Sequence, residues 1–160
     1  MTTNDAIASR RFRARPVEVT AIDQWIMEVA ASWQGEWAVF RTRLCVAEIA
    51  ANVVEHGQDD RADAEIIVTL DRAETGIDIE IADSGRPFDP TAVEPVPAAH
   101  TIETAPVGGR GLRILRTFAR GLSYRRDGNF NHVRMHVPAE AFSGNVEAGL
   151  PIENAIMQKC

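Results

Sequence analysis

The stretch from residue 48 to residue 56, Glu48-Ile49-Ala50-Ala51-Asn52-Val53-Val54-Glu55-His56, places a polar side chain at every fourth position of an otherwise apolar run. At that spacing Glu48, Asn52 and His56 lie along one side of a helix. A helix that serves packing alone gains nothing from a carboxylate, an amide and an imidazole among apolar neighbours, because each needs a partner or water. This polar stripe indicates a site, although a solvated helix edge has the same spacing.

Length and composition are those of a globular protein with one domain. The chain has 160 residues, 45% of them hydrophobic and 25% charged, and a net charge of -6. These values exclude the disordered and fibrous classes. The acidic balance argues against a nucleic-acid binder, which normally has a basic surface. The cluster of Arg10, Arg11, Arg13 and Arg15 fits a solvated strand or arm better, so we expect no direct nucleic-acid binding.

The cysteines and the apolar runs indicate the compartment. Cys45 and Cys160 are too few for a disulfide framework and lack metal-ligand spacing, so we expect free thiols in a reducing environment. The N-terminus lacks the apolar core of a signal peptide, and no run of about 18 apolar residues occurs. The sequence therefore predicts a cytoplasmic protein without a membrane span.

The first third of the chain reads as a flexible start, a strand and two helices. Residues 1–10 form the expected flexible N-terminus, and a short strand is predicted from Arg11 to Val19. From Thr20 the apolar residues recur at three- and four-residue steps, as in a helix. A second helix, from Glu36 through Val54, carries the polar stripe. It should stop at Gly57, which tolerates the positive φ of a helix end.

The pattern then changes to a period of two, which is typical of strands. Ala64 to Leu70 and Gly76 to Ile81 each alternate apolar and polar residues, and a turn at Glu74-Thr75-Gly76 would join them as a hairpin. Alternation means that one sheet face is covered and the other is wet. We therefore expect an α+β fold, a two-layer sandwich whose mixed, mostly antiparallel sheet has helices on one face, rather than a doubly wound parallel sheet.

The rest of the chain contains a long connection, a third helix and a second hairpin. The segment from about 89 to 107 has no periodicity and is too long for a simple link, which is typical of a functional lid. The third helix opens at Gly108-Gly109-Arg110-Gly111. A hairpin of Leu122–Tyr124 and Val133–Val137 would turn at Asp127-Gly128, and residues 139–160 form a C-terminal tail.

Two further motifs, together with the polar stripe, indicate a binding site. A strand ending in Asp83-Ser84-Gly85 places a carboxylate at the margin of the sheet, beside a glycine that permits close approach. The glycine-rich helix start at 108–111 offers backbone N–H groups and the positive helix end that anions favour. Alone, the first is an ordinary turn signal and the second lacks the Rossmann and Walker spacings.

Together the three motifs resemble the N, G1 and G2 boxes of the GHKL ATPases. The matching residues are Glu48-x-x-x-Asn52-x-x-x-His56, Asp83-x-Gly85-x-x-Phe88-Asp89 and Gly108-Gly109-x-Gly111-Leu112. Within that superfamily the likeness is greatest to the bacterial anti-sigma factor serine kinases. It spans residues 11–138, which the resemblance makes one ATP-binding domain of the Bergerat type, with residues 89–107 as the ATP lid.

The resemblance implies roles for single residues. Glu48 would take the proton from an attacking serine hydroxyl, and Asn52 would bind Mg²⁺ through its side-chain oxygen, which suits a hard cation. Asp83 would accept a hydrogen bond from the adenine amino group. The nucleotide would also contact residues of all three boxes. These are His56, Gly85, Phe88, Gly108, Gly109, Arg110, Gly111 and Leu112.

Two of these assignments have ordinary alternatives. A histidine near a helix end is often a cap or a packed residue, so His56 is either a ligand contact or structural. Arg110 would either reach a phosphate or point into solvent. One position departs from the family: some members have an arginine immediately before the glycine-rich box, and Val107 stands there. Charge on the phosphates would then be balanced by Mg²⁺, Arg110 or a partner.

The resemblance predicts an anti-sigma factor with ATP-dependent protein serine/threonine kinase activity. Its partners would be an STAS-type anti-anti-sigma protein, which it phosphorylates, and a sigma factor, and it would regulate transcription by switching between them. A homodimer is implied as well, and the helix face with Trp25 would serve either the dimer or the core. Two alternatives stay open: an ATP-dependent partner-binding module with little or no kinase activity, and the detached catalytic domain of a histidine kinase.

Overall fold

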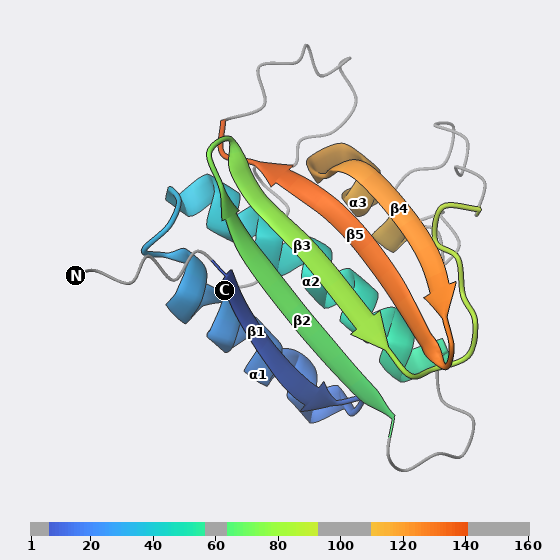
Figure 1. The fold of residues 1–160 in the computed structure, drawn as a ribbon. Coiled ribbons are helices and arrows are strands. Elements are labelled where there is room, and N and C mark those ends of the chain that lie inside the picture. The colour runs from blue at the N-terminus through green and yellow to red at the C-terminus, as the bar shows by residue number, and fades with distance from the viewer. Residues whose placement is uncertain (1–6, 57–63, 93–109, 141–160) are drawn as a thin grey trace.

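The computed structural model describes residues 7–56, 64–92 and 110–140. In these residues one antiparallel sheet is covered on one face by three helices (Figure 1). The strands are β1 (Ile7–Arg13), β2 (Glu65–Ala73), β3 (Gly76–Asp83), β4 (Arg120–Asp127) and β5 (Phe130–Pro138), in the spatial order β1-β2-β3-β5-β4. The helices are α1 (Pro16–Ala30), α2 (Glu36–His56) and α3 (Arg110–Phe118). The predicted two-layer α+β architecture is confirmed.

The core lies between the sheet and the helices, where the alternation of the strands predicted it. The buried strand residues follow a period of two, namely Ile66, Val68 and Leu70 in β2, Ile77, Ile79 and Ile81 in β3, and Val133, Met135 and Val137 in β5. Helix α2 packs Val46 and Ile49 into the same core. Burial of these side chains is the main favourable contribution to folding.

The opposite face of the sheet is polar, as the alternation also predicted. Glu80 on β3 accepts hydrogen bonds from Arg134 Nε (2.9 Å), and its other oxygen lies 2.8 Å from His132 Nδ1. Asp78 is 2.7 Å from His136 on the same strand pair. Cross-strand pairs of this kind satisfy the polar groups while water covers the face.

Two expectations about the N-terminal region were wrong. The first strand runs from Ile7 to Arg13, so residues 7–10 are ordered and the strand does not extend to Val19. The reason is pairing: all seven residues of β1 lie opposite β2, from Ile7 beside Asp71 to Arg13 beside Glu65. Helix α1 begins at Pro16 rather than at Thr20, because the fixed φ of proline suits the first helical position.

Two other expectations needed correction in the sheet. All four strand pairings are antiparallel, so the sheet is not mixed. The second hairpin turns at Gly128-Asn129 instead of Asp127-Gly128, since Asp127 still pairs with Phe130. Gly128 has φ +54°, a value that glycine adopts without the cost other residues incur.

Other boundaries agree with the sequence. The first hairpin leaves only Glu74 and Thr75 between β2 and β3, and α2 begins at Glu36 as expected. Gly57, most of the expected lid (residues 93–107) and the tail from residue 141 lie outside the described residues. Among those described, no helix is long and apolar enough to cross a membrane.

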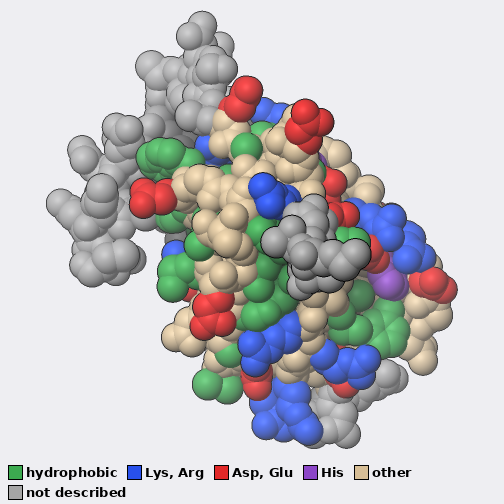
Figure 2. Space-filling view, turned by 60° about the vertical axis from the view of Figure 1, so that its left-hand side comes forward, with side chains coloured by type: hydrophobic (Ala, Val, Ile, Leu, Met, Phe, Trp, Pro, Cys, Tyr) green, Lys and Arg blue, Asp and Glu red, His purple; other side chains and the backbone are tan. Residues whose placement is uncertain are grey.

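The arginines near the N-terminus do not form a basic surface of their own. On the face shown in Figure 2, basic side chains are interspersed with acidic and hydrophobic ones. Arg11 Nη1 lies 3.2 Å from a Glu65 oxygen, and the Arg10 guanidinium lies 5.3 Å from the centre of the Phe12 ring. Partners of this kind belong to an edge strand, which is the interpretation that the sequence favoured.

Candidate functional site

Asp83 is the last residue of β3, and its side chain is buried where the strand meets α2 (4% exposed). Its Oδ1 accepts two hydrogen bonds, from the Gly85 backbone N–H and from Asn131 Nδ2, both at 2.9 Å. None of the described residues donates a hydrogen bond to Oδ2. Burial raises the pKa of the Asp83 carboxyl, and the bonds from Asn131 and Gly85 oppose the rise. Oδ2 is therefore the acceptor that Asp83 has left for a ligand.

Asn131 on β5 holds this carboxylate, and the sequence analysis missed it. It lies directly opposite Asp83 in the strand register and is 2% exposed. A signal was present: Asn131, Val133, Met135 and Val137 form the inward-facing series of β5, and a lone amide in such a series needs a buried partner. That partner is 48 residues away, so its identity required the strand register.

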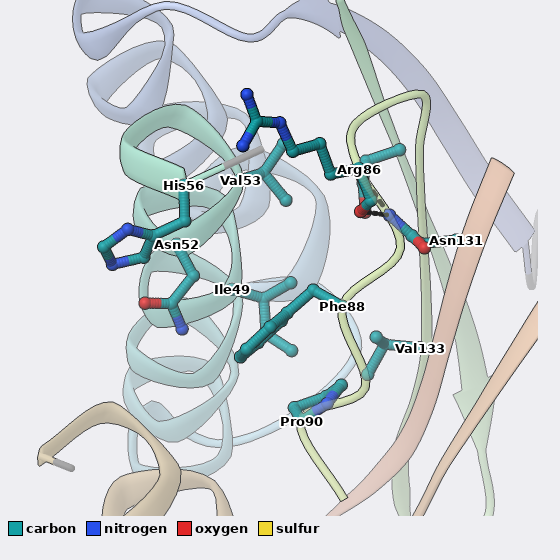
Figure 3. A pocket seen from close by; sticks show the side chains of 10 residues that line it. Ile49, Asn52, Val53, His56, Arg86, Phe88, Pro90, Asn131 and Val133 are labelled. Atoms are coloured by element: carbon teal, nitrogen blue, oxygen red, sulfur yellow. Dashed lines mark hydrogen bonds between the residues drawn. The ribbon is translucent and has the colours of Figure 1, made fainter. Parts of the chain in front are cut away.

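A cavity joins Asp83 to the polar stripe of α2 (Figure 3). Its lining comes from α2, from the segment after β3 and from β5, and consists of Ile49, Asn52, Val53, His56, Asp83, Arg86, Phe88, Pro90, Asn131 and Val133. Asn52 and Asp83 therefore share one cavity, as the three-motif hypothesis required. Asn52 and His56 of the polar stripe therefore meet the strand-end aspartate at one cavity, and Glu48 is not among its lining residues.

The cavity has a volume of about 30 Å³. Phe88 and Pro90 lie over it (Figure 3), and Phe88 leaves 42% of its surface exposed. An aromatic ring exposed at the mouth of a cavity can stack on a planar ligand.

Glu48 lies two turns before His56 on α2 and faces the start of α3. A side chain at Gly111 would collide with it, because a Cβ built there would be 2.5 Å from Glu48 Oε2. Glu48 is half-buried, and burial raises the pKa of its carboxyl. An alanine at this position would make the flexible end of the Glu48 side chain move aside, so α2 and the start of α3 meet at Gly111 and the Glu48 carboxylate.

The other predicted site residues lie in different surroundings, and some lie outside the described residues. Leu112 is buried in the core (4% exposed), which gives it a packing role. His56 is exposed and lies 3.7 Å from Glu55, and Gly85 is buried beside Asp83. Gly108, Gly109, Val107 and the side chain of Arg110 lie outside the described residues. The structure thus assembles the first two motifs and the Gly111 end of the third.

The donors present suit a nucleotide with a hard cation better than a metal centre built from protein alone. In the described parts of the chain, no three His, Cys, Asp or Glu side chains are grouped so as to hold a metal ion. Asn52 offers an amide oxygen that makes no hydrogen bond with another described residue. Mg²⁺ is commonly held by one or two protein oxygens together with phosphate and water, and Asn52 fits that pattern.

Comparison with known proteins assigns this fold and site to a class, the ATPase domains related to histidine kinases. The family described as histidine kinase-like ATPase domain matches residues 12–137. This chain belongs to that family, and membership implies that the domain binds ATP. The match covers the sheet except residues 7–11 of β1 and Pro138 at the end of β5, and it includes Glu48, Asn52, Asp83 and Gly111.

Two known proteins are similar to this chain. The serine/threonine-protein kinase BtrW of Bordetella bronchiseptica is 32% identical over 114 residues, which are 69% of this chain and 79% of that protein. The histidine kinase domain of the blue-light activated histidine kinase EL346 of Erythrobacter litoralis is similar in structure, with a TM-score of 0.46 and 18% identity. That comparison covers 77% of this chain and 60% of the other.

Proposed function

We propose that this chain is an ATP-dependent protein serine/threonine kinase that acts on an STAS-type anti-anti-sigma protein and also binds a sigma factor. Partner switching between the two would regulate transcription. The observation that carries the kinase proposal is the position of Glu48, a half-buried carboxylate against Gly111 and one helical turn from Asn52. The likeness to a relative named a serine/threonine-protein kinase supports it.

The residues at the end of β3 would recognise the base. Asp83 Oδ2 would accept a hydrogen bond from the 6-amino group of adenine, since Oδ1 is already filled. Guanine has a carbonyl at that position, so two acceptors would face each other. The Gly85 backbone, which has no side chain in the way, would let the base approach the loop.

The phosphates would bind where α2 meets the start of α3. Asn52 would hold Mg²⁺, whose chemistry when bound is to neutralise charge on the phosphates. Gly109 and Gly111 would bring backbone amides to the same anions. Glu48 would accept the proton of the partner's serine hydroxyl, and the raised pKa of its carboxyl makes it a better base than a solvated glutamate.

The test is transfer of labelled phosphate from ATP to a purified STAS-type protein by the full chain with Mg²⁺. We expect phosphoserine or phosphothreonine on that protein. In the Glu48→Gln variant transfer should fall by about 10² to 10⁴, while ATP affinity stays within about twofold. Undiminished transfer by Glu48→Gln would remove Glu48 from the proposal.

Two other outcomes would support the alternative functions, a binding module or a histidine kinase domain. Tight ATP binding and nucleotide-dependent capture of the partner, with no transfer by the wild type, would indicate a binding module, which Val107 in place of an arginine also favours. Product phosphate lost in acid would indicate phosphohistidine and a histidine kinase domain. Acid-stable phosphate on serine or threonine excludes both.

A further inference from the structure

The side chain of Asn131 makes four hydrogen bonds, which is all that an amide has to offer. Its Nδ2 donates to Asp83 Oδ1 (2.9 Å) and to the Arg86 backbone carbonyl (2.8 Å). Its Oδ1 accepts from the Tyr124 hydroxyl and from Arg126 Nη1, both at 2.9 Å. A buried amide with every position filled is held in one orientation.

The chemistry of the partners fixes which end of the amide faces Asp83. The backbone carbonyl of Arg86 only accepts, and the guanidinium of Arg126 only donates. The nitrogen of Asn131 must therefore point toward Asp83, whose Oδ1 then receives two donors. Two donors on one oxygen favour the ionised carboxylate and leave Oδ2 as its acceptor toward the cavity.

Arg126 secures this arrangement from outside the cavity, which it does not line. It lies near the end of β4 and is an exposed residue, although its hydrogen bonds to Gly85 and Asn131 are partly buried. Nη1 also donates to the Gly85 backbone carbonyl (3.0 Å), and Nε donates to the Gly128 carbonyl (3.2 Å). One guanidinium thus links the β4–β5 turn, the loop after β3 and the amide that holds Asp83.

We propose that Arg126 is a positioning residue that makes the site select a 6-aminopurine nucleotide over a 6-oxopurine one, by locking Asn131 with its nitrogen toward Asp83. Tyr124 assists by filling the second acceptor position of the same amide. The proposal rests on the proposed ATP binding at Asp83. It assigns base selectivity to a side chain that touches neither the base nor the phosphates.

The electrostatics of Asp83 support the proposal. Burial raises the pKa of its carboxyl, while the hydrogen bonds from Asn131 and Gly85 and the charge of Arg126 oppose that rise. Without Arg126, the amide loses one of its four hydrogen bonds and is held less firmly, and the buried carboxyl is easier to protonate because a nearby positive charge is gone. A protonated Oδ2 can donate to the carbonyl of guanine, so discrimination between the two bases weakens.

The experiment measures ATP and GTP affinities of the full chain by competition against a fluorescent ATP analogue. Arg126→Met should lower the ratio of ATP to GTP affinity by about tenfold, and Tyr124→Phe by about threefold, as expected for hydrogen bonds of charged and neutral groups. The matched control is Arg125→Met on the same strand, whose ion pairs are with Asp127 and Glu80. Its ratio should stay within about twofold of the wild type.

A purely structural role for Arg126 predicts another result, namely equal losses for ATP and GTP with the ratio unchanged. That result, or an Arg126→Met protein that melts as the wild type does and keeps the wild-type ratio, would overturn the inference while the proposed function stands. Tyr124→Phe tests the same lock if Arg126→Met does not fold. A wild type that binds neither nucleotide would instead overturn the proposed function itself.

Discussion

The two ends of the site are prepared differently for a ligand. At the Asp83 end, made of Asp83, Asn131, Tyr124 and Arg126, side chains are fixed by a chain of hydrogen bonds between 2.9 Å and 3.0 Å. At the Glu48 end, made of Glu48, Asn52 and Gly111, the two polar side chains make no hydrogen bond with another described residue. One end is organised before binding, and the other is left with its polar groups open.

The difference teaches which contribution each end can make. A preorganised acceptor costs little to order on binding, so the Asp83 end suits affinity and selectivity. At the Glu48 end the polar groups are half-buried and burial raises the pKa of the Glu48 carboxyl, so under the proposed function this end would serve the chemistry. Substitutions at the first end should change nucleotide affinity, and those at the second should change stability, metal dependence and turnover.

The strongest test is Asp83→Asn. The new amide can still present an oxygen to Asn131 and Gly85, but it then faces the adenine amino group with a donor. ATP affinity should fall by about 100-fold, or about 2.7 kcal/mol, as for an unpaired buried polar contact, with a melting temperature no lower than that of the wild type, since burial raises the pKa of the Asp83 carboxyl. Titration with a fluorescent ATP analogue measures it, and a loss below about threefold would show that Asp83 does not read the base.

Gly111→Ala tests the packing at the Glu48 end. In an ordinary helix this change stabilises by up to ~1 kcal/mol, but here the new Cβ would meet Glu48 Oε2 at 2.5 Å. Oε2 is the far end of a flexible side chain, so Glu48 can move aside, and we expect the usual gain to be largely lost, with the free energy of unfolding within about 0.5 kcal/mol of the wild type. Urea unfolding measures it.

The Glu48→Ala background supplies the control for that substitution. With the carboxylate gone, Gly111→Ala should stabilise by up to ~1 kcal/mol, and the double-mutant cycle should show coupling. Equal changes in both backgrounds would mean that the two residues do not meet as the structure has them.

Asn52→Ala should uncouple nucleotide binding from the metal. In the wild type, removing Mg²⁺ with a chelator should weaken ATP binding, whereas in the variant it should have no effect. At saturating Mg²⁺ the variant should bind ATP about tenfold more weakly than the wild type, a difference of about 1.4 kcal/mol. His56→Ala, one turn along the same stripe, is the matched control and should keep the Mg²⁺ dependence. A variant as dependent on Mg²⁺ as the wild type would exclude Asn52 as the ligand.

Glu48→Gln should stabilise the free protein. Burial raises the pKa of the Glu48 carboxyl, so the folded state binds its proton more tightly than the unfolded state, and stability falls as pH rises above the unfolded value. At pH 7 to 8 the variant should therefore have a higher melting temperature than the wild type, because it carries no buried charge at this position. The difference should vanish below pH ~4, near the unfolded glutamate pKa. A gain that is the same at every pH would point to packing instead of charge.

The features that were predictable from the sequence are local ones. The spacing of Glu48, Asn52 and His56, the alternation in β2 and β3, and the aspartate before Gly85 depend on neighbours within a few residues, and each pattern has a period that reads directly as helix or strand. Trp25 was expected in the core or in a dimer contact, and the structure puts it in the core (8% exposed), with its ring 5.8 Å from Phe12.

Other features depended on parts of the chain that are far apart. The first strand starts at Ile7 because β2 is there to pair with it, and no period within residues 7–13 indicates that. Asn131 became a site residue through its register with Asp83, and Arg126 through a turn that brings its guanidinium to the Gly85 carbonyl. Local sequence specifies helix faces and strand alternation, because backbone geometry repeats over a few residues. Which polar groups meet across the sheet is decided by strand register, which exists only in the folded chain.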